Sequence, residues 1–106
     1  MEMLIQKIVL NPQCREPFLA ELETANERLR QARGFLSGIV LASRNNPLVI
    51  YYFSMWMDRA SIRDFEAWLP HFRELHRDWI QEVVEENLEV LLSVTQEGDF
   101  RPVGDA

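Results

Sequence analysis

Residues 3–10 form an apolar run that is broken only by Gln6 and Lys7 and ends at a turn signal, Asn11-Pro12. Side chains alternate between the two faces of a strand. The pattern therefore predicts a strand whose even-numbered positions, Gln6 among them, share one apolar face.

Apolar residues then recur at steps of three and four from Phe18 to Ala32, and Gly34 ends the pattern. This spacing predicts an amphipathic helix that stops at a glycine. Two apolar runs rich in β-branched and aromatic residues follow, 35–43 and 48–57, with a turn cluster at 44–47 between them. They predict a hairpin.

A second helical pattern begins after Asp58, whose side chain is suited to accept hydrogen bonds from the first helical turn. Its apolar stripe is expected to continue to Val83, with a kink or break at Pro70. The run 88–94 predicts the last strand. The stripe consists of Ile62, Phe65, Trp68, Leu69, Phe72, Leu75, Trp79, Ile80 and Val83.

The order strand, helix, strand, strand, helix, strand predicts a ferredoxin-like α+β fold, βαββαβ, with both helices on one face of an antiparallel sheet. We expect a single domain over residues 1–96 and a loosely held C-terminal tail over 97–106. The strand at 48–57 offers Tyr51, Phe53 and Met55 to one face and Tyr52 and Trp56 to the other. An apolar sheet face without a cover predicts a homodimer that pairs sheet on sheet, a dimeric α+β barrel.

Charge and composition exclude several classes of partner. The net charge is −6 and the basic residues form no run, which argues against binding nucleic acid or an anionic membrane surface. No apolar run approaches the roughly 18 residues of a membrane span, and the first residues lack the order of a signal peptide, so we expect a cytoplasmic protein. Cys14 is the only cysteine, which excludes an internal disulfide and predicts a surface or partly buried thiol.

Three residues are candidates for chemistry. His76 lies in the apolar stripe, so its ring faces the sheet either as a hydrogen-bonded core residue or as a ligand or acid–base group. Trp68, eight residues earlier, projects from the same helical face as core packing or as the wall of a cleft. Gln6 on its apolar strand face needs a hydrogen-bond partner, which a substrate, a dioxygen-derived species or a neighbouring side chain could supply.

Other polar residues are expected to be solvated. His71 lies beside charged neighbours, and the acidic pairs Glu21/Glu23 and Glu85-Glu86 are predicted on helix surfaces. The chain has no glycine-rich phosphate loop, no GxSxG elbow, no HExxH motif and no histidine–carboxylate set at metal spacing. The sequence therefore predicts no resident metal.

The segments PFLAELE, GFLSGIVLAS and SMWMDRASIRDFEAW resemble the antibiotic-biosynthesis monooxygenase family of dimeric α+β barrels, over about residues 3–96. The most specific pieces are Gly34-Phe35-Leu36, opening the second strand, and Trp56, closing the third. The resemblance implies a ferredoxin-like dimer. It also implies kinship with cofactor-independent quinone-forming monooxygenases, heme-degrading monooxygenases and other small-molecule enzymes.

The heme-degrading branch of that family carries an asparagine in the first strand, a tryptophan early in the second helical segment and a histidine that ligates heme iron. Trp68 and His76 resemble the last two, with a spacing that requires a small deletion. Gln6 stands at the asparagine position and is longer by one methylene.

The leading expectation is a small-molecule monooxygenase that acts without a cofactor on a small aromatic or other apolar substrate. In that hypothesis Trp68 walls the cleft, His76 accepts or donates a proton and Gln6 orients a substrate oxygen. One alternative is a heme-binding or heme-degrading protein with His76 as the axial ligand. The other is a non-catalytic dimeric protein that binds a small molecule.

Overall fold

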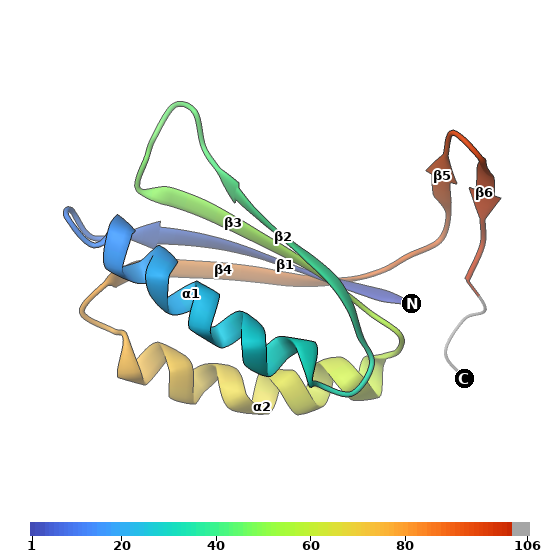
Figure 1. Ribbon diagram of the computed structural model, residues 1–106, viewed down its shortest axis with the longest axis horizontal. Helices are drawn as coiled ribbons and strands as arrows, with labels where there is room; N and C mark the ends of the chain where they lie inside the picture. The colour runs from blue at the N-terminus through green and yellow to red at the C-terminus, as the bar shows by residue number, and fades with distance from the viewer. Residues whose placement is uncertain (103–106) are drawn as a thin grey trace.

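A computed structural model describes residues 1–102 as two layers, a four-stranded antiparallel sheet and two helices that cover one of its faces (Figure 1). The strand order is β2-β3-β1-β4, and this arrangement confirms the predicted ferredoxin-like α+β fold. The elements are β1 (Glu2–Leu10), α1 (Arg15–Arg30), β2 (Phe35–Ala42), β3 (Val49–Trp56), α2 (Arg59–Leu75), β4 (Ile80–Glu89), β5 (Ser93–Thr95) and β6 (Gly98–Phe100).

Local signals set the start and the course of α2. The Oδ1 atom of Asp58 accepts hydrogen bonds from the backbone N–H and the hydroxyl of Ser61, both at 2.8 Å, which confirms the predicted cap. The helix then continues through Pro70 without a break, contrary to one of the two expectations for this residue. Pro70 and Glu66, whose carbonyl loses its usual helical donor, are both exposed, so water can satisfy that carbonyl.

Gly34 joins α1 to β2 at a point where no other residue fits. Its φ is +77°, in the left-handed region, and a Cβ atom built there would collide with the side chain of Ser61. Its carbonyl accepts a hydrogen bond from the N–H of Met57 at 2.8 Å. The glycine therefore lets the start of β2 lie against the start of α2.

The C-terminal half of the sheet differs from the prediction. Helix α2 ends at Leu75, with His76 as its C-cap, and β4 begins at Ile80 instead of at residue 88. Asn11 holds this connection to the end of β1: its side-chain amide donates to the carbonyl of Asp78 at 2.8 Å, and its backbone N–H donates to the carbonyl of Trp79 at 2.9 Å.

A β-bulge explains why the start of β4 resembles a helix in the sequence. Ile80 pairs with Leu10 and Glu82 pairs with Val9, so Gln81 is an extra residue on β4. The bulge places Ile80 and Val83 on the same face of the sheet although they are three residues apart, a helical spacing. The prediction of a helical stripe up to Val83 was therefore wrong.

The same shift corrects the assignment of the second acidic pair. Glu85 and Glu86 lie on β4 and not on a helix surface. Because successive strand residues point to opposite faces, Glu85 faces the helices while Glu86 faces away from them.

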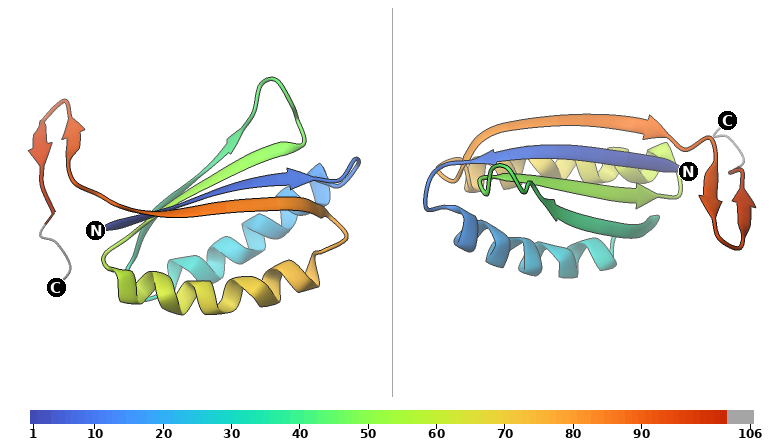
Figure 2. Two further views of the ribbon diagram at one scale, coloured as in Figure 1. Left: turned by 180° about the vertical axis from the view of Figure 1, so that it is seen from behind. Right: turned by 90° about the horizontal axis from the view of Figure 1, so that it is seen from above.

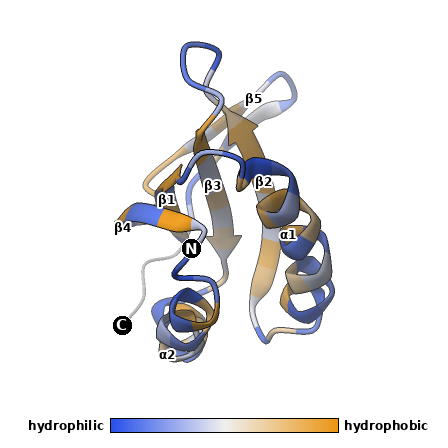
Figure 3. Cartoon of the chain, turned by 90° about the vertical axis from the view of Figure 1, so that its left-hand side faces the viewer, coloured by the Kyte–Doolittle hydropathy of each residue, from blue (hydrophilic) through white to orange (hydrophobic). Residues whose placement is uncertain are grey.

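The core lies between the sheet and the two helices. In Figure 3 strands β2 and β3 are coloured largely hydrophobic, whereas both helices carry hydrophobic and hydrophilic colours. Tyr52 and Trp56 are buried on this side of β3, whereas Tyr51, Phe53 and Met55 lie on the opposite face and are only partly buried, which confirms the two-faced pattern of this strand. The buried apolar residues are Leu4, Ile8, Leu10, Phe18, Leu22, Leu29, Val49, Ile50, Tyr52, Trp56, Ile62 and Leu69.

Beyond β4 the chain forms a small hairpin, β5–β6, that projects from the end of the sheet (Figure 2). This differs from the expected last strand at 88–94, because β4 ends at Glu89 and β5 begins at Ser93. Strand β6 falls within the segment predicted as a loose tail, and the last part of that segment, 103–106, lies outside the described residues. Over residues 1–102, no helix is both long enough and apolar enough to cross a membrane.

Candidate functional site

An apolar cavity of about 50 Å³ lies between the two helices and the sheet. It has room for a few water molecules and is smaller than the roughly 300–1,000 Å³ of ordinary ligand pockets. Two of the three predicted site residues, Gln6 and Trp68, lie in its wall. The full lining is Gln6, Ile8, Phe18, Leu22, Ala25, Leu29, Tyr52, Phe65, Trp68, Leu69, Phe72, Arg73, Ile80 and Val83.

The sheet supplies a polar row to this cavity. Strand pairing aligns Val40, Tyr52, Gln6 and Glu85 across β2, β3, β1 and β4. The Nε2 atom of Gln6 donates to Oε2 of Glu85 at 3.3 Å, and the other carboxylate oxygen of Glu85 pairs with the Arg73 guanidinium. A neighbouring side chain is therefore the hydrogen-bond partner that Gln6, 7% exposed, was predicted to require.

Tyr52 is the second polar group of the row. Its hydroxyl donates to Oδ1 of Asn26 on α1 at 3.3 Å, and burial raises the pKa of the phenol. A Cβ atom at Gly38 would lie 2.7 Å from this hydroxyl, so the glycine makes room for it. Tyr52 thus faces the cavity region as a neutral donor.

Trp68 forms part of the wall on the α2 side. Its indole packs between the rings of Phe65 and Phe72, with centroid separations of 5.8 and 5.1 Å. On the outside, the Arg28 guanidinium lies 5.0 Å from the ring centroid, in cation–π geometry. The residue is half-buried, with one side toward the core and another toward the surface.

His76 lies beside the cavity and does not line it. Its ring stacks on Trp79 with the centroids 4.7 Å apart and meets the edge of Phe72, which does line the cavity, at 4.6 Å. The Nε2 atom is buried and has no hydrogen-bond partner among residues 1–102; the nearest acid is Glu21, whose Oε1 lies 3.7 Å away. The structure therefore separates His76 from Gln6 and Trp68 by the ring of Phe72.

Four polar residues near the site were not predicted as site residues: Tyr52, Arg73, Glu85 and Glu21. Tyr52 was recognised in the sequence only as an apolar position, and Glu85 was assigned to a helix surface. Its place opposite Gln6 follows only from the correct start of β4. His71, which was predicted to be solvated, is exposed.

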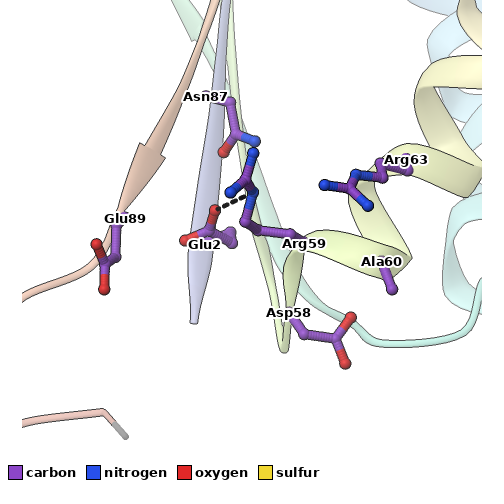
Figure 4. A pocket seen from close by; sticks show the side chains of 7 residues that line it. All are labelled: Glu2, Asp58, Arg59, Ala60, Arg63, Asn87 and Glu89. Carbon is purple, nitrogen blue, oxygen red and sulfur yellow. Dashed lines mark ion pairs between the residues drawn. The ribbon is translucent and has the colours of Figure 1, made fainter. Parts of the chain in front are cut away.

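A larger and more polar pocket, of about 700 Å³, opens at the other end of β1 (Figure 4). Arg59 and Arg63 reach into it from the first turns of α2, and Arg59 pairs with the buried Glu2 at 4.0 Å. It shares no lining residue with the inner cavity. The apolar inner cavity is the better candidate for the site, since small-molecule sites are mostly apolar with a few polar groups.

In this conformation the residues around His76 leave no room for heme. The Nε2 atom is buried, and the Glu21 carboxylate lies 3.7 Å from it, which leaves no space for an iron atom between them. The His76 ring also packs against Phe72 and Trp79. The neighbouring cavity of about 50 Å³ has no room for a porphyrin. Within residues 1–102, no group of three histidine, cysteine or acidic side chains could hold a metal ion.

A family model described as antibiotic biosynthesis monooxygenase matches residues 1–78, which include β1 through α2. The chain belongs to this family. The match ends just before β4, so the model covers Gln6, Trp68 and His76 but not Glu85. No curated protein sequence shows significant similarity to the chain.

Solved structures share the fold at low sequence identity. The structure of PA3566 from Pseudomonas aeruginosa superposes with a TM-score of 0.73 at 22% identity, over 85% of this chain and 93% of that one. Rv0793 from Mycobacterium tuberculosis gives a TM-score of 0.76 at 15% identity, over 89% and 98%. A protein structure from Nitrosomonas europaea gives a TM-score of 0.75 at 17% identity, over 86% of this chain and 99% of that one. At these identities the likeness shows the fold alone.

Proposed function

We propose that this family member is a monooxygenase that oxidises a small aromatic substrate without a metal or flavin. The observation that carries the proposal is the apolar cavity into which the family fold brings Gln6 and Trp68 together. An apolar space with few polar groups suits a planar, weakly polar substrate. Because the cavity is small in this conformation, the substrate would have to displace side chains as it binds.

The residues in the wall suggest how such a substrate is held. The Trp68 indole offers a flat surface against which an aromatic ring can stack. Gln6 donates through Nε2 to Glu85, which leaves its Oε1 atom to accept a hydrogen bond from a substrate hydroxyl. Arg73, in the same wall, places a positive charge where a phenolate would develop.

The proposed reaction needs no added reductant. Loss of a proton from an activated ring carbon leaves a carbanion, which gives one electron to dioxygen. The resulting radical pair combines into a hydroperoxide, and loss of water from it leaves a carbonyl, so that R₂CH₂ and O₂ become R₂C=O and H₂O. The substrate supplies all the electrons, and the protein supplies binding, orientation and a proton acceptor.

We assign the proton transfer to His76. A buried ring nitrogen without a partner is uncommon in folded proteins, and an imidazole is a side chain that can both accept and donate a proton. The carboxylate of Glu21 is close enough to stabilise the imidazolium that would form. Since Phe72 lies between His76 and the cavity, its ring would have to turn aside when the substrate binds.

We further propose that the protein works as a homodimer. The sheet face away from the helices carries apolar side chains on all four strands, including Ile39, Phe53, Ile5 and Val84. A face of this kind, covered by a second copy, would bury well over about 1,000 Å² in total, the size of a stable interface. Dimers are also what the family fold leads us to expect.

Oxygen consumption tests the proposed activity. The purified protein, treated with a chelator and free of flavin, would be incubated with a panel of polyhydroxylated naphthalenes. Oxygen uptake would be followed with an oxygen electrode, and quinone formation by absorbance. We expect turnover that falls at least about 100-fold in Gln6→Leu and less in Gln6→Asn, since Asn keeps the amide.

Gln13→Leu is the matched control, because Gln13 is exposed and lies in the turn after β1. Oxygen consumption that requires added heme or flavin would contradict the proposal. So would a Gln6→Leu variant that turns over as fast as Gln13→Leu. A heme titration completes the set: we expect no Soret shift that depends on His76.

A further inference from the structure

The inner cavity shares a wall with a surface groove that lies between α1 and α2. This groove has a volume of about 310 Å³ and is open to solvent. Four residues line both spaces: Ala25 and Leu29 on α1, and Phe65 and Trp68 on α2. Trp68 is the largest of them, so a rotation of its indole would join the two spaces into one of ordinary ligand-site size.

Ring contacts with Phe65 and Phe72 hold the inner part of the Trp68 indole, and the Arg28 guanidinium covers its outer face at 5.0 Å from the ring centroid. Arg28 is exposed and forms no ion pair among residues 1–102. At an exposed position a cation–π contact of this kind is easily broken and remade.

Stronger contacts close the other boundaries of the cavity. Between α1 and the sheet, the Tyr52 hydroxyl donates to Asn26. Between α2 and β4, Arg73 pairs with Glu85, which also accepts from Gln6. The remaining wall is the sheet itself, whose strands are hydrogen-bonded side by side and leave no passage. The boundary between α1 and α2 is therefore the one that opens at the lowest cost.

We propose that Arg28 and Trp68 form the gate through which substrate enters the cavity, and that the gate favours planar aromatic anions. The mouth of the groove carries two arginines, Arg28 and Arg33, against one acid, Asp64. Asp58, which bonds to Ser61 in the same wall, interacts with Arg33, whereas Arg28 forms no ion pair among residues 1–102 and places a positive charge beside Trp68 in a chain whose net charge is −6. The inference rests on the proposed function, because it takes the inner cavity as the substrate site.

Stopped-flow fluorescence with a neutral probe, 2-naphthalenemethanol, tests the gate. In Arg28→Gln we expect the association and dissociation rates both to rise about two- to five-fold while Kd stays nearly unchanged, since a looser gate lowers the barrier in both directions. Asn26→Ala and Arg73→Gln loosen the two other boundaries and serve as matched controls. Neither should raise both rates.

The charge preference is tested with 2-naphthoate, an anion built on the same ring system. We expect it to bind several-fold more tightly than 2-naphthalenemethanol at low salt, and this advantage to shrink in Arg33→Gln and in 0.5 M salt. Equal affinities of the two probes for the wild type would overturn the charge preference.

The outcomes separate this inference from the proposed function. If the probes bind and Arg28→Gln leaves both rates unchanged, or if a control variant raises them instead, the gate is overturned while the cavity stands as the site. If neither probe binds to the wild type at millimolar concentration, the cavity is not a site for aromatic ligands, and the proposed function and the gate are overturned together.

Discussion

The two faces of the central sheet are built from similar residues and have different surroundings. On the helix side, Leu4, Ile50 and Trp56 are almost fully buried, and a small cavity remains among the aromatic rings. On the other side, Ile39 is 57% exposed and Val84 is 53% exposed. Strand composition alone therefore does not make a core, because a second layer must supply the packing.

The difference between the faces also separates two kinds of role. The helix side combines apolar packing with a polar row that contains Gln6, Tyr52 and Glu85, and this combination is what a binding site requires. The opposite face is mostly apolar, with charged side chains at Lys7 on the interior strand β1 and at Glu82 and Glu86 on the edge strand β4. It is suited to cover by another sheet and not to chemistry.

The largest expected effect comes from placing the same charge on each face. Ile50→Asp introduces a carboxylate at a position that is 1% exposed, so we expect the free energy of unfolding to fall by about 4 kcal/mol or more. Ile39→Asp changes an exposed position and should leave the helical circular dichroism intact. Urea denaturation of the two variants measures the contrast directly.

Ile39→Asp also tests the proposed dimer. Light scattering of the wild type should give twice the 12.5 kDa chain mass, about 25 kDa, and the variant should give the mass of one chain, because a carboxylate in a sheet–sheet interface has no partner. A wild type that is monomeric at micromolar concentration would refute sheet-on-sheet pairing. A variant that stays dimeric would place the interface elsewhere.

A smaller effect is expected at His76. His76→Leu is close to volume-conserving and removes a buried nitrogen that has no partner, so the free energy of unfolding should change by less than about 1.5 kcal/mol. Turnover should fall by at least about 100-fold. If the variant unfolds while Trp68→Phe is silent in both stability and turnover, His76 is a core residue and its assignment to proton transfer is wrong.

The smallest effect concerns Tyr52 and appears only at high pH. Burial raises the pKa of this phenol above the unfolded value of about 10, so the folded state favours the neutral form. The contribution of that preference to stability is complete below about pH 10 and is lost as the pH rises toward the folded pKa. Denaturation at pH 8 and pH 11 should show a steeper alkaline loss in the wild type than in Tyr52→Phe. Equal losses would contradict the assignment.

Much of the fold could be predicted from short-range patterns. The alternation in β1 correctly predicted that Gln6 lies on the buried face, and Asp58 correctly predicted the start of α2. The apolar runs on either side of residues 44–47 predicted the hairpin of β2 and β3. The prediction failed where long-range pairing changes the local period. The bulge at Gln81 gives Ile80 and Val83 a helical spacing, and nothing in the sequence near them reveals that their partners are Leu10 and Ile8.

Periodicity in the sequence correctly predicted the inward-facing residues of β1, β3 and the part of α2 from Ile62 to Phe72, because the periods of strands and helices follow from backbone geometry. It also determined that one strand offers apolar residues to both faces. Which polar groups contact one another depends on the tertiary structure. Gln6 donates a hydrogen bond to Glu85, 79 positions later in the chain. The ring of Phe72 lies between His76 and the cavity. Arg28 on α1 lies over the ring of Trp68 on α2. Such contacts depend on strand register and on the packing of helices against the sheet, which local periodicity does not encode.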